Sequence, residues 1–340
     1  MTRDDPLIVV LGGTGYLGSS LVSRLAALGV RTRAVGRRQA WRTLPLIEHV
    51  RADVTCKTDL AAVVREADAV VHLVALLSGG RSWRVAEDDP EGHRVTVQPM
   101  YDLLDITGAD RRAPLPIVTA GTTTIAGCPD RARLDGTEPD RPGTAYDRHK
   151  QAVERALLTA TESGVALGVP LRLPTVYGAG AGSPGSGVVS AMAARAVAGL
   201  PLTMWHDGSV LRDLVHVSDV ASALWLAVRH AAALGGRTWL IGSGDAIPLG
   251  DVLRMIAAAT TRWTRDAPVP VVRVDPPEYA TPADFCDVEV DPGPFTAITG
   301  WRATVRLEDG VDAVVRATLA ETDRYRDARK PLPTNRISPS

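Results

Sequence analysis

A glycine-rich turn between two patterned segments constrains the fold of this chain more than any other feature. The apolar run at residues 7–11 is rich in β-branched residues and short enough for a buried parallel strand. Gly12, Gly15 and Gly18 follow it, and apolar residues then recur at helical spacing over residues 19–28. The glycines therefore lie in a strand-to-helix turn, where a pyrophosphate can approach the helix N-terminus. We expect a dinucleotide site here.

Strand and helix patterns alternate through the first half of the chain. Further strands are expected at residues 32–35, 49–52, 69–75, 115–119 and 169–173, and helices at 59–66, 91–107 and 145–163. This alternation predicts an α/β fold, a Rossmann-type doubly wound parallel sheet with helices on both faces. The second half is less regular and predicts a smaller mixed α/β C-terminal substrate lobe, with helices at 187–200 and from Leu307 onward.

The chain of 340 residues is too long for one core of typical size. We expect a dinucleotide-binding Rossmann domain at residues 1–177, with a return segment at about 213–245. Residues 178–212 and 246–325 would form the substrate-binding lobe. Residues 327–340 are charged and proline-rich, and we expect them to be a disordered tail.

The composition excludes several classes of function. A net charge of −1 gives no basic excess to attract nucleic acid. No apolar run approaches the ~20 residues of a membrane span, and we expect no signal peptide, because the first expected strand follows the N-terminus directly. Cys56, Cys128 and Cys286 are widely spaced and odd in number, so we expect neither a disulfide nor a metal site, and a reducing cytoplasm. His72 and His216 lie in apolar runs and are expected to be satisfied core histidines.

The end of the second expected strand indicates which dinucleotide binds. An acidic residue at this position binds the 2′-hydroxyl of NAD, whereas an arginine accommodates the 2′-phosphate of NADP. Here the strand ends in Gly36, Arg37 and Arg38, with no acid. We therefore favour NADP(H), the alternative being two solvated arginines. Asp53 is expected to reach toward the adenine, and Ala75 to lie near the cofactor at a strand tip.

Tyr146 and Lys150 lie one turn apart on the expected helix at 145–163. Free tyrosine has a pKa of about 10, and a nearby ammonium favours the phenolate, so this tyrosine could exchange protons closer to neutral pH. That chemistry suits the reduction of a ketone to an alcohol. Thr122, at the tip of the preceding strand, could hydrogen-bond a carbonyl oxygen, or could simply cap a turn.

These motifs together resemble the extended short-chain dehydrogenase/reductase family, the sugar-nucleotide epimerase/dehydratase group. The resemblance covers roughly residues 6–325 and includes the segments 171–178, 212–221 and 299–301. Within the family, the segments 72–75, 78–84 and 203–209 look most like NADPH-dependent 4-ketoreductases of antibiotic deoxysugar pathways. Their substrates are dTDP-4-keto-6-deoxyhexoses.

The resemblance implies a role for each matching residue. Tyr146 would protonate the C4 oxygen, Lys150 would lower the tyrosine pKa and bind the nicotinamide ribose, and Thr122 would hold the carbonyl. The implied cofactor contacts are Gly12, Thr14, Gly15, Tyr16, Leu17, Gly18, Arg37, Arg38, Asp53, Val54, Leu73, Ala75, Tyr146, Lys150 and Pro174. The implied substrate contacts are Ser78, Trp83, Thr123, Trp205 and Arg212.

Two of these substrate contacts have alternatives. Arg212 would grip the nucleotide diphosphate, but could also form a surface ion pair with Asp213. Trp205 would stack on the thymine, but could equally be a core residue. By analogy with the family, the helices at 91–107 and 145–163 would pair across a two-fold axis in a homodimer.

The chain also departs from the family pattern. Thr96 stands where an asparagine is usual, so an asparagine-dependent proton relay is in doubt. Thr123 and Thr124 stand where dehydratases carry an Asp-Glu pair, so 4,6-dehydration is not expected.

The sequence is also compatible with two other functions. A sugar-nucleotide epimerase would return the hydride to the same sugar, but such enzymes more often carry the acid that is missing at Gly36. A non-catalytic NADP-binding sensor would share the fold, but such relatives typically lose the tyrosine or the lysine.

Overall fold

Seven parallel strands form the central sheet, in the order β11-β7-β5-β4-β1-β2-β3. The computed structural model describes residues 6–38, 43–76, 89–110, 113–131, 133–180, 187–205, 207–278 and 280–328. The strands are β1 (Ile8–Leu11), β2 (Thr32–Gly36), β3 (Ile47–Arg51), β4 (Ala69–His72), β5 (Leu115–Thr122), β7 (Ala166–Leu173) and β11 (Trp239–Leu240). All but the short β11 fall where the sequence predicts a strand.

The sheet has a topological switch point beside β1. Ile8 pairs with Thr32 of β2 on one side and with Ala69 of β4 on the other. In open parallel sheets, ligands bind at the carboxyl ends of the strands where the order reverses. The glycine turn follows β1 and so lies at this point.

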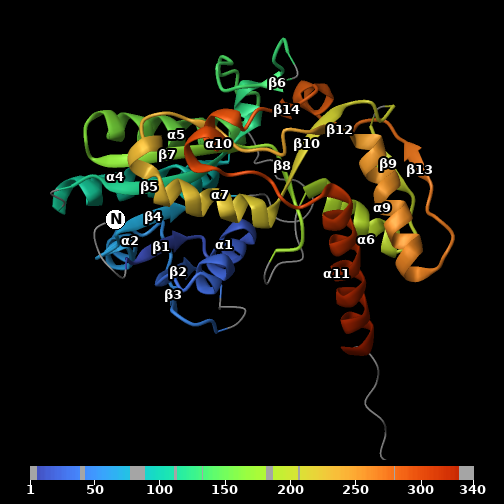
Figure 1. The fold of residues 1–340 in the computed structure, drawn as a ribbon, viewed down its shortest axis with the longest axis horizontal. Helices are drawn as coiled ribbons and strands as arrows, with labels where there is room; N and C mark the ends of the chain where they lie inside the picture. The colour runs from blue at the N-terminus through green and yellow to red at the C-terminus, as the bar shows by residue number, and fades with distance from the viewer. Residues whose placement is uncertain are drawn as a thin grey trace, which may run out of the picture.

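Helices cover both faces of the sheet (Figure 1). One core includes Val10, Val71 and Leu224, and is closed by α1 (Tyr16–Ala27), α7 (Val217–Arg229) and α8 (Ala231–Leu234). The other includes Val9, Val70 and Leu157, and is closed by α2 (Lys57–Val64), α4 (Gln98–Asp110) and α5 (Ala145–Glu162). Alternate residues of each strand face opposite cores, so the doubly wound fold class is confirmed.

A second group of elements stands beside the sheet (Figure 1). Its core includes Tyr177, Leu253 and Val314. The helices of this group are α6 (Gly187–Val197), α9 (Leu249–Thr264) and α11 (Leu307–Ala328), and its strands are β8 (Thr175–Tyr177), β9 (Leu202–Met204), β10 (Leu211–His216), β12 (Ala246–Pro248) and β13 (Val271–Arg273). The remaining elements, β6 (Arg133–Leu134), β14 (Glu289–Val290) and α10 (Gly293–Thr299), complete the chain.

Three expectations about local structure are wrong. The helix expected at 91–107 is two helices, α3 (Pro90–Thr96) and α4, which meet at Val97, because Pro99 has no N–H to continue the hydrogen bonds of α3 and instead lies in the first turn of α4. Strand β4 ends at His72, so Ala75 lies three residues beyond it. Helix α11 continues to Ala328, so the start of the expected tail at 327–340 is helical, and its remainder lies outside the described residues.

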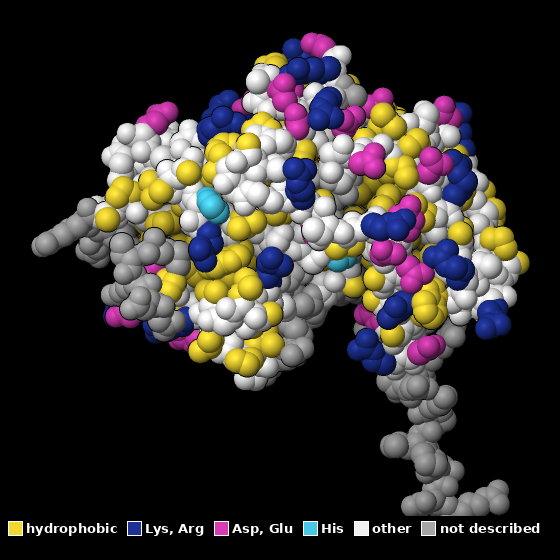
Figure 2. Space-filling view, in the orientation of Figure 1, with side chains coloured by type: hydrophobic (Ala, Val, Ile, Leu, Met, Phe, Trp, Pro, Cys, Tyr) yellow, Lys and Arg dark blue, Asp and Glu magenta, His cyan; other side chains and the backbone are white. Residues whose placement is uncertain are grey.

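The face of the molecule seen in Figure 2 carries charged side chains of both signs, scattered among apolar and polar ones. This distribution agrees with the net charge of −1. Within the described ranges, no helix combines the length and apolar character needed to cross a membrane.

Candidate active site

Helix α5 places Tyr146 and Lys150 against the carboxyl end of β5. The helix begins at a capping box, in which Thr144 and Asp147 bond to each other's backbone N–H. This fixes the first turn, which carries Tyr146. Lys150 is 7% exposed, and its Nζ donates to the carbonyl of Ala120 at 2.8 Å. The ammonium is thus tied to the strand that ends in Thr122.

The proton affinities of the pair differ from the expectation. Burial raises the pKa of Tyr146 above its usual value, and the negative charge of Asp147 raises it further. Burial lowers the pKa of Lys150 to about 8. The expected phenolate-favouring effect of Lys150 is therefore wrong for this structure, and Tyr146 is held as a neutral phenol. A neutral phenol is a proton donor, as a general acid must be.

Thr122 lies at the tip of β5 within a chain of hydroxyl groups. Its Oγ1 accepts from the backbone N–H of Thr124 at 3.2 Å and lies 2.8 Å from Thr124 Oγ1. The Thr124 hydroxyl in turn donates to Asp147 Oδ1. Thr122 therefore caps the turn that follows β5, and its hydroxyl is linked through Thr124 to Asp147 of α5. Thr123 beside it is buried.

His72 is a buried polar group whose environment the sequence did not reveal. Its side chain is 1% exposed, and burial followed by the charge of Lys150 lowers its pKa to about 4. Its Nε2 has no hydrogen-bond partner among the described residues, so the expectation of a satisfied core histidine is wrong in this respect. His72 pairs in register with Thr119, next to the Ala120 carbonyl that holds Lys150.

The glycine turn is packed too closely for side chains. A Cβ on Gly18 would lie 2.1 Å from the carbonyl oxygen of Gly12, and one on Gly12 would lie 3.2 Å from the Leu73 carbonyl. Gly15 is the N-cap of α1 and offers no side chain to its first turn. The helix N-terminus is thus left to an external anion, so these residues fit the pyrophosphate of a dinucleotide.

Thr14 closes the space above the end of β2. A Cβ on Gly36 would lie 2.3 Å from Thr14 Oγ1. A carboxylate side chain at position 36 therefore cannot be added without moving Thr14. Arg37 and Arg38 follow and are exposed.

A further arginine, Arg94, lies near the residues that follow β3. Asp53 accepts from the N–H and hydroxyl of Thr55, and these bonds, with the charges of Arg37 and Arg94, lower its pKa. Arg94 of α3 donates to the Thr55 hydroxyl at 2.9 Å. Arg94 was not among the expected cofactor contacts, because α3 approaches the end of β3 only in the folded chain. Val54 is buried beside Asp53.

Tyr16 connects the glycine turn to the second group of elements. Its hydroxyl donates to the carbonyl of Gly178 at 2.8 Å, and burial raises its pKa. Leu17, also in α1, is partly buried and packs against the core that α1, α7 and α8 close. Pro174 joins β7 to β8 just before this contact. These expected cofactor contacts therefore gather near the carboxyl ends of the strands.

The structure gives Arg212 a different set of partners from those expected. Its guanidinium donates to the backbone carbonyls of Leu211, Asp284 and Cys286, and not to Asp213. Burial lowers its pKa. The surface ion pair is therefore wrong, and a diphosphate would have to share or replace these carbonyl contacts. Its expected contact with the diphosphate stays a prediction.

The other expected substrate contacts are only partly described. Trp205 follows β9 and is half-buried, so it is not a fully enclosed core residue. Ser78 and Trp83 lie outside the described residues.

Cys128 and Cys286 form a disulfide, which the sequence analysis did not expect. Their Cα atoms are 5.6 Å apart although 158 positions separate them in the chain. Cys286 also supplies one of the carbonyls that hold Arg212. Spacing along the sequence gave no signal of this pairing, since it depends on the fold. Cys56 is free and exposed.

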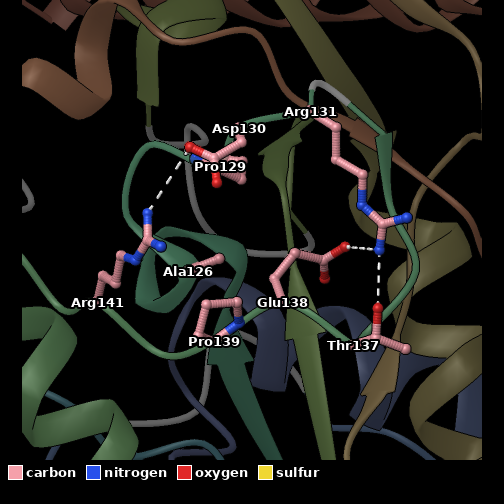
Figure 3. A pocket seen from close by; sticks show the side chains of 8 residues that line it. All are labelled: Ala126, Pro129, Asp130, Arg131, Thr137, Glu138, Pro139 and Arg141. Atoms are coloured by element: carbon pink, nitrogen blue, oxygen red, sulfur yellow. Dashed lines mark hydrogen bonds and ion pairs between the residues drawn. The ribbon is translucent and has the colours of Figure 1, made fainter.

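A pocket of about 250 Å³ is lined by residues of the chain segment that joins β5 to α5, and neither Tyr146 nor Lys150 lines it (Figure 3). Arg131 reaches Thr137 and Glu138 across it, and Arg141 points toward Asp130. These charges are paired with one another, so the pocket is not where we place the chemistry. The described residues include no cluster suited to a metal ion.

Comparisons with known proteins agree with this geometry. The profile described as the NAD dependent epimerase/dehydratase family matches residues 8–242. The chain is 26% identical to a UDP-glucose 4-epimerase of Azospirillum brasilense over 94% of this chain and 92% of that protein. It is 28% identical to a dTDP-6-deoxy-L-talose 4-dehydrogenase (NAD(P)(+)) of Kitasatospora kifunensis over 66% and 71%. The solved structure of MoeE5 in complex with UDP-glucose and NAD has 26% identity and a TM-score of 0.76, covering 93% of this chain and 99% of that one.

Proposed function

Since the chain belongs to the NAD dependent epimerase/dehydratase family, we propose that it uses NADPH to reduce the C4 ketone of a dTDP-4-keto-6-deoxyhexose. Such a step finishes a deoxysugar for a glycosylated natural product. The observation that carries this proposal is the end of β2, where Thr14 fills the space beside Gly36 and two exposed arginines follow.

This site favours a phosphorylated ribose. No carboxylate fits beside Gly36 to take a 2′-hydroxyl, whereas Arg37 and Arg38 offer charge and planar donors to a 2′-phosphate. Arg94 adds a third positive charge near Asp53. The glycine turn would hold the pyrophosphate, and Lys150 the nicotinamide ribose. NADPH supplies the hydride when bound.

The chain's own residues supply and place the proton. Tyr146 is kept protonated by burial and by Asp147, so it can give its proton to the C4 oxygen. Lys150 is fixed by the Ala120 carbonyl, which keeps its charge close to the reacting atoms. Thr122 borders the same position from the tip of β5.

One relative supports the choice of reaction. The name of the Kitasatospora protein describes oxidation at C4 of a dTDP-6-deoxyhexose with either dinucleotide. That reaction is the reverse of the one proposed here. Thr123 and Thr124 occupy the positions of a dehydratase's acids, and Thr124 is engaged by Asp147, which argues against 4,6-dehydration.

The test is to mix purified protein with NADPH and a dTDP-4-keto-6-deoxyhexose and follow the absorbance of reduced nicotinamide. We expect one NADPH to be oxidised for each ketone reduced.

An epimerase is the second candidate, favoured by the similarity to a UDP-glucose 4-epimerase over nearly the full length of both chains. It would interconvert 4-hydroxy sugar nucleotides with no net change in absorbance.

A non-catalytic NADP-binding sensor is the third candidate. It would bind the dinucleotide but turn over neither kind of sugar. The pairing of Tyr146 and Lys150 on one face of α5 argues against it. Loss of the biological process in a Tyr146→Phe strain would exclude a sensor, whereas an unaffected strain would favour it.

We also propose a homodimer that pairs α4 and α5 across a two-fold axis. These two helices pack side by side on one face of the sheet, and Tyr101 of α4 is exposed. Light scattering should give twice the mass of the chain, and a monomer's mass would reject the dimer.

A further inference from the structure

Asp147 is a buried carboxylate directly after the proposed proton donor. It is 2% exposed. Its Oδ2 accepts from the backbone N–H of Thr144 at 3.1 Å and from the Thr144 hydroxyl at 2.8 Å. Its Oδ1 accepts from the Thr124 hydroxyl. Because three donors converge on it, Asp147 is bound as an acceptor at both oxygens.

This arrangement fixes the direction of the hydroxyl chain. A threonine hydroxyl has one proton, and that of Thr124 is given to Asp147. In its 2.8 Å contact with Thr122, Thr124 must therefore accept. The single proton of Thr122 then points to Thr124 and away from the substrate. One Thr122 lone pair takes the Thr124 N–H, which leaves one lone pair toward the site.

We propose that Asp147 is a positioning residue that makes Thr122 a hydrogen-bond acceptor toward the substrate. The inference rests on the proposed function. A ketone oxygen has no proton to give, so Thr122 cannot bond to it and Tyr146 is its donor. The alcohol product does have a proton and can donate to Thr122. The site therefore favours the alcohol over the ketone at C4.

Asp147→Asn reverses this direction without changing the side chain's shape. The Thr144 N–H must still meet an oxygen, so the amide oxygen stays on that side and preserves the helix cap. The amide NH₂ then faces Thr124 and donates to it. Thr124 turns its proton to Thr122, and the Thr122 proton becomes available to a ketone oxygen.

The experiment measures the dissociation constants of a 4-keto and a 4-hydroxy dTDP-6-deoxyhexose without dinucleotide, so that neither reacts. We expect the ratio of the ketone constant to the alcohol constant to fall roughly tenfold in D147N, the size of the one hydrogen bond that the ketone gains, since the alcohol exchanges donating to Thr122 for accepting from it. Thr124→Val cuts the chain at another point, also frees the Thr122 proton, and should shift the ratio in the same direction.

Thr144→Ala is the matched control. It removes the Thr144 hydroxyl from the cap and should lower the unfolding temperature, but it leaves the Thr124 contact with Asp147 intact. The ratio should therefore stay at the wild-type value. An unchanged ratio in both D147N and T124V, or an equal change in T144A, would overturn the inference.

Neutron diffraction on deuterated protein tests the same point without any substrate. We expect deuterium on Thr124 Oγ1 toward Asp147 and on Thr122 Oγ1 toward Thr124. Deuterium placed from Thr124 toward Thr122 would overturn the inference. The expected placement together with no binding of either sugar nucleotide would instead reject the proposed function and leave the hydroxyl direction standing.

Discussion

The Nζ of Lys150 lies 5.8 Å from the centre of the Tyr146 ring and donates its hydrogen bond to the Ala120 carbonyl. The ammonium is thus anchored to β5 and not to the phenol. Burial favours the neutral form of both groups, so the tyrosine holds its proton and the lysine loses its proton readily.

The pH dependence of activity should report Lys150. Its pKa in the folded protein is lowered to about 8, so the ammonium is present below that pH and lost above it. We expect kcat/KM for ketone reduction to fall as the pH rises through about 8. Lys150→Arg should remove this limb from whatever activity remains, because arginine keeps its charge. A wild-type profile that stays flat to pH ~10 would contradict the assignment, since that is near the pKa of a free lysine.

The same pKa shift affects stability. Because the folded-state pKa lies below that of an exposed lysine, the unfolded state binds more protons between about pH 8 and the usual lysine value. The contribution of Lys150 to stability should therefore rise with pH through this window and be constant below it. Urea unfolding of wild type and Lys150→Met at several pH values isolates this contribution, and parallel curves would contradict it.

Replacing Tyr146 with phenylalanine removes the proton donor but keeps the ring. We expect kcat for ketone reduction to fall by more than ~10²-fold, while the dissociation constant for NADPH changes little. Stopped-flow kinetics and a fluorescence titration measure the two quantities. Near-normal turnover in the variant would show that another group donates the proton.

Cofactor preference should depend on Thr14 as well as on the arginines. Gly36→Asp alone should weaken both dinucleotides, because the new side chain meets Thr14. Adding Thr14→Ala removes that obstacle and should favour NADH. Isothermal titration with both dinucleotides measures the outcome.

The matched variant for this test is Arg37→Ala/Arg38→Ala. It should weaken NADPH by ~10- to 100-fold, the worth of charge-assisted hydrogen bonds, and leave NADH nearly unchanged. Equal weakening of both dinucleotides would place the arginines outside the ribose site.

The disulfide should contribute to stability. It links positions 158 apart, and a disulfide, which limits the freedom of the unfolded chain, typically contributes ~2–4 kcal/mol. Reduction, or the double variant Cys128→Ser/Cys286→Ser, should lower the free energy of unfolding by this amount. Cys56→Ser is the control, since Cys56 is unpaired. Equal stability under oxidising and reducing conditions would contradict the link.

Local patterns were sufficient to predict the sheet and the position of α5. The run before Gly12 and the period of residues 145–163 each depend on nearby residues only, and both elements lie where they were expected. The same patterns predicted one helix where the structure has α3 and α4, because the prediction gave too little importance to Pro99.

Contacts between distant positions could not be predicted in this way. The Cys128–Cys286 bond, the carbonyl partners of Arg212 and the Thr124–Asp147 contact all join separate elements. The periodicity of a sequence does not indicate which side chains of separate elements come into contact. The prediction that the pKa of Tyr146 is lowered was wrong for the same reason. The burial of Tyr146 and its closeness to the charge of Asp147, which raise this pKa, depend on the folded structure.

The most direct test of the proposed reaction follows the hydride itself. NADPH carrying deuterium in place of both C4 hydrogens of its nicotinamide is incubated with the protein and a dTDP-4-keto-6-deoxyhexose, and the product is examined by mass spectrometry and NMR. We predict one deuterium at C4 of each product sugar and one NADP⁺ formed with it. A product without deuterium, or exchange between 4-hydroxy sugars with no NADP⁺ released, would contradict the account.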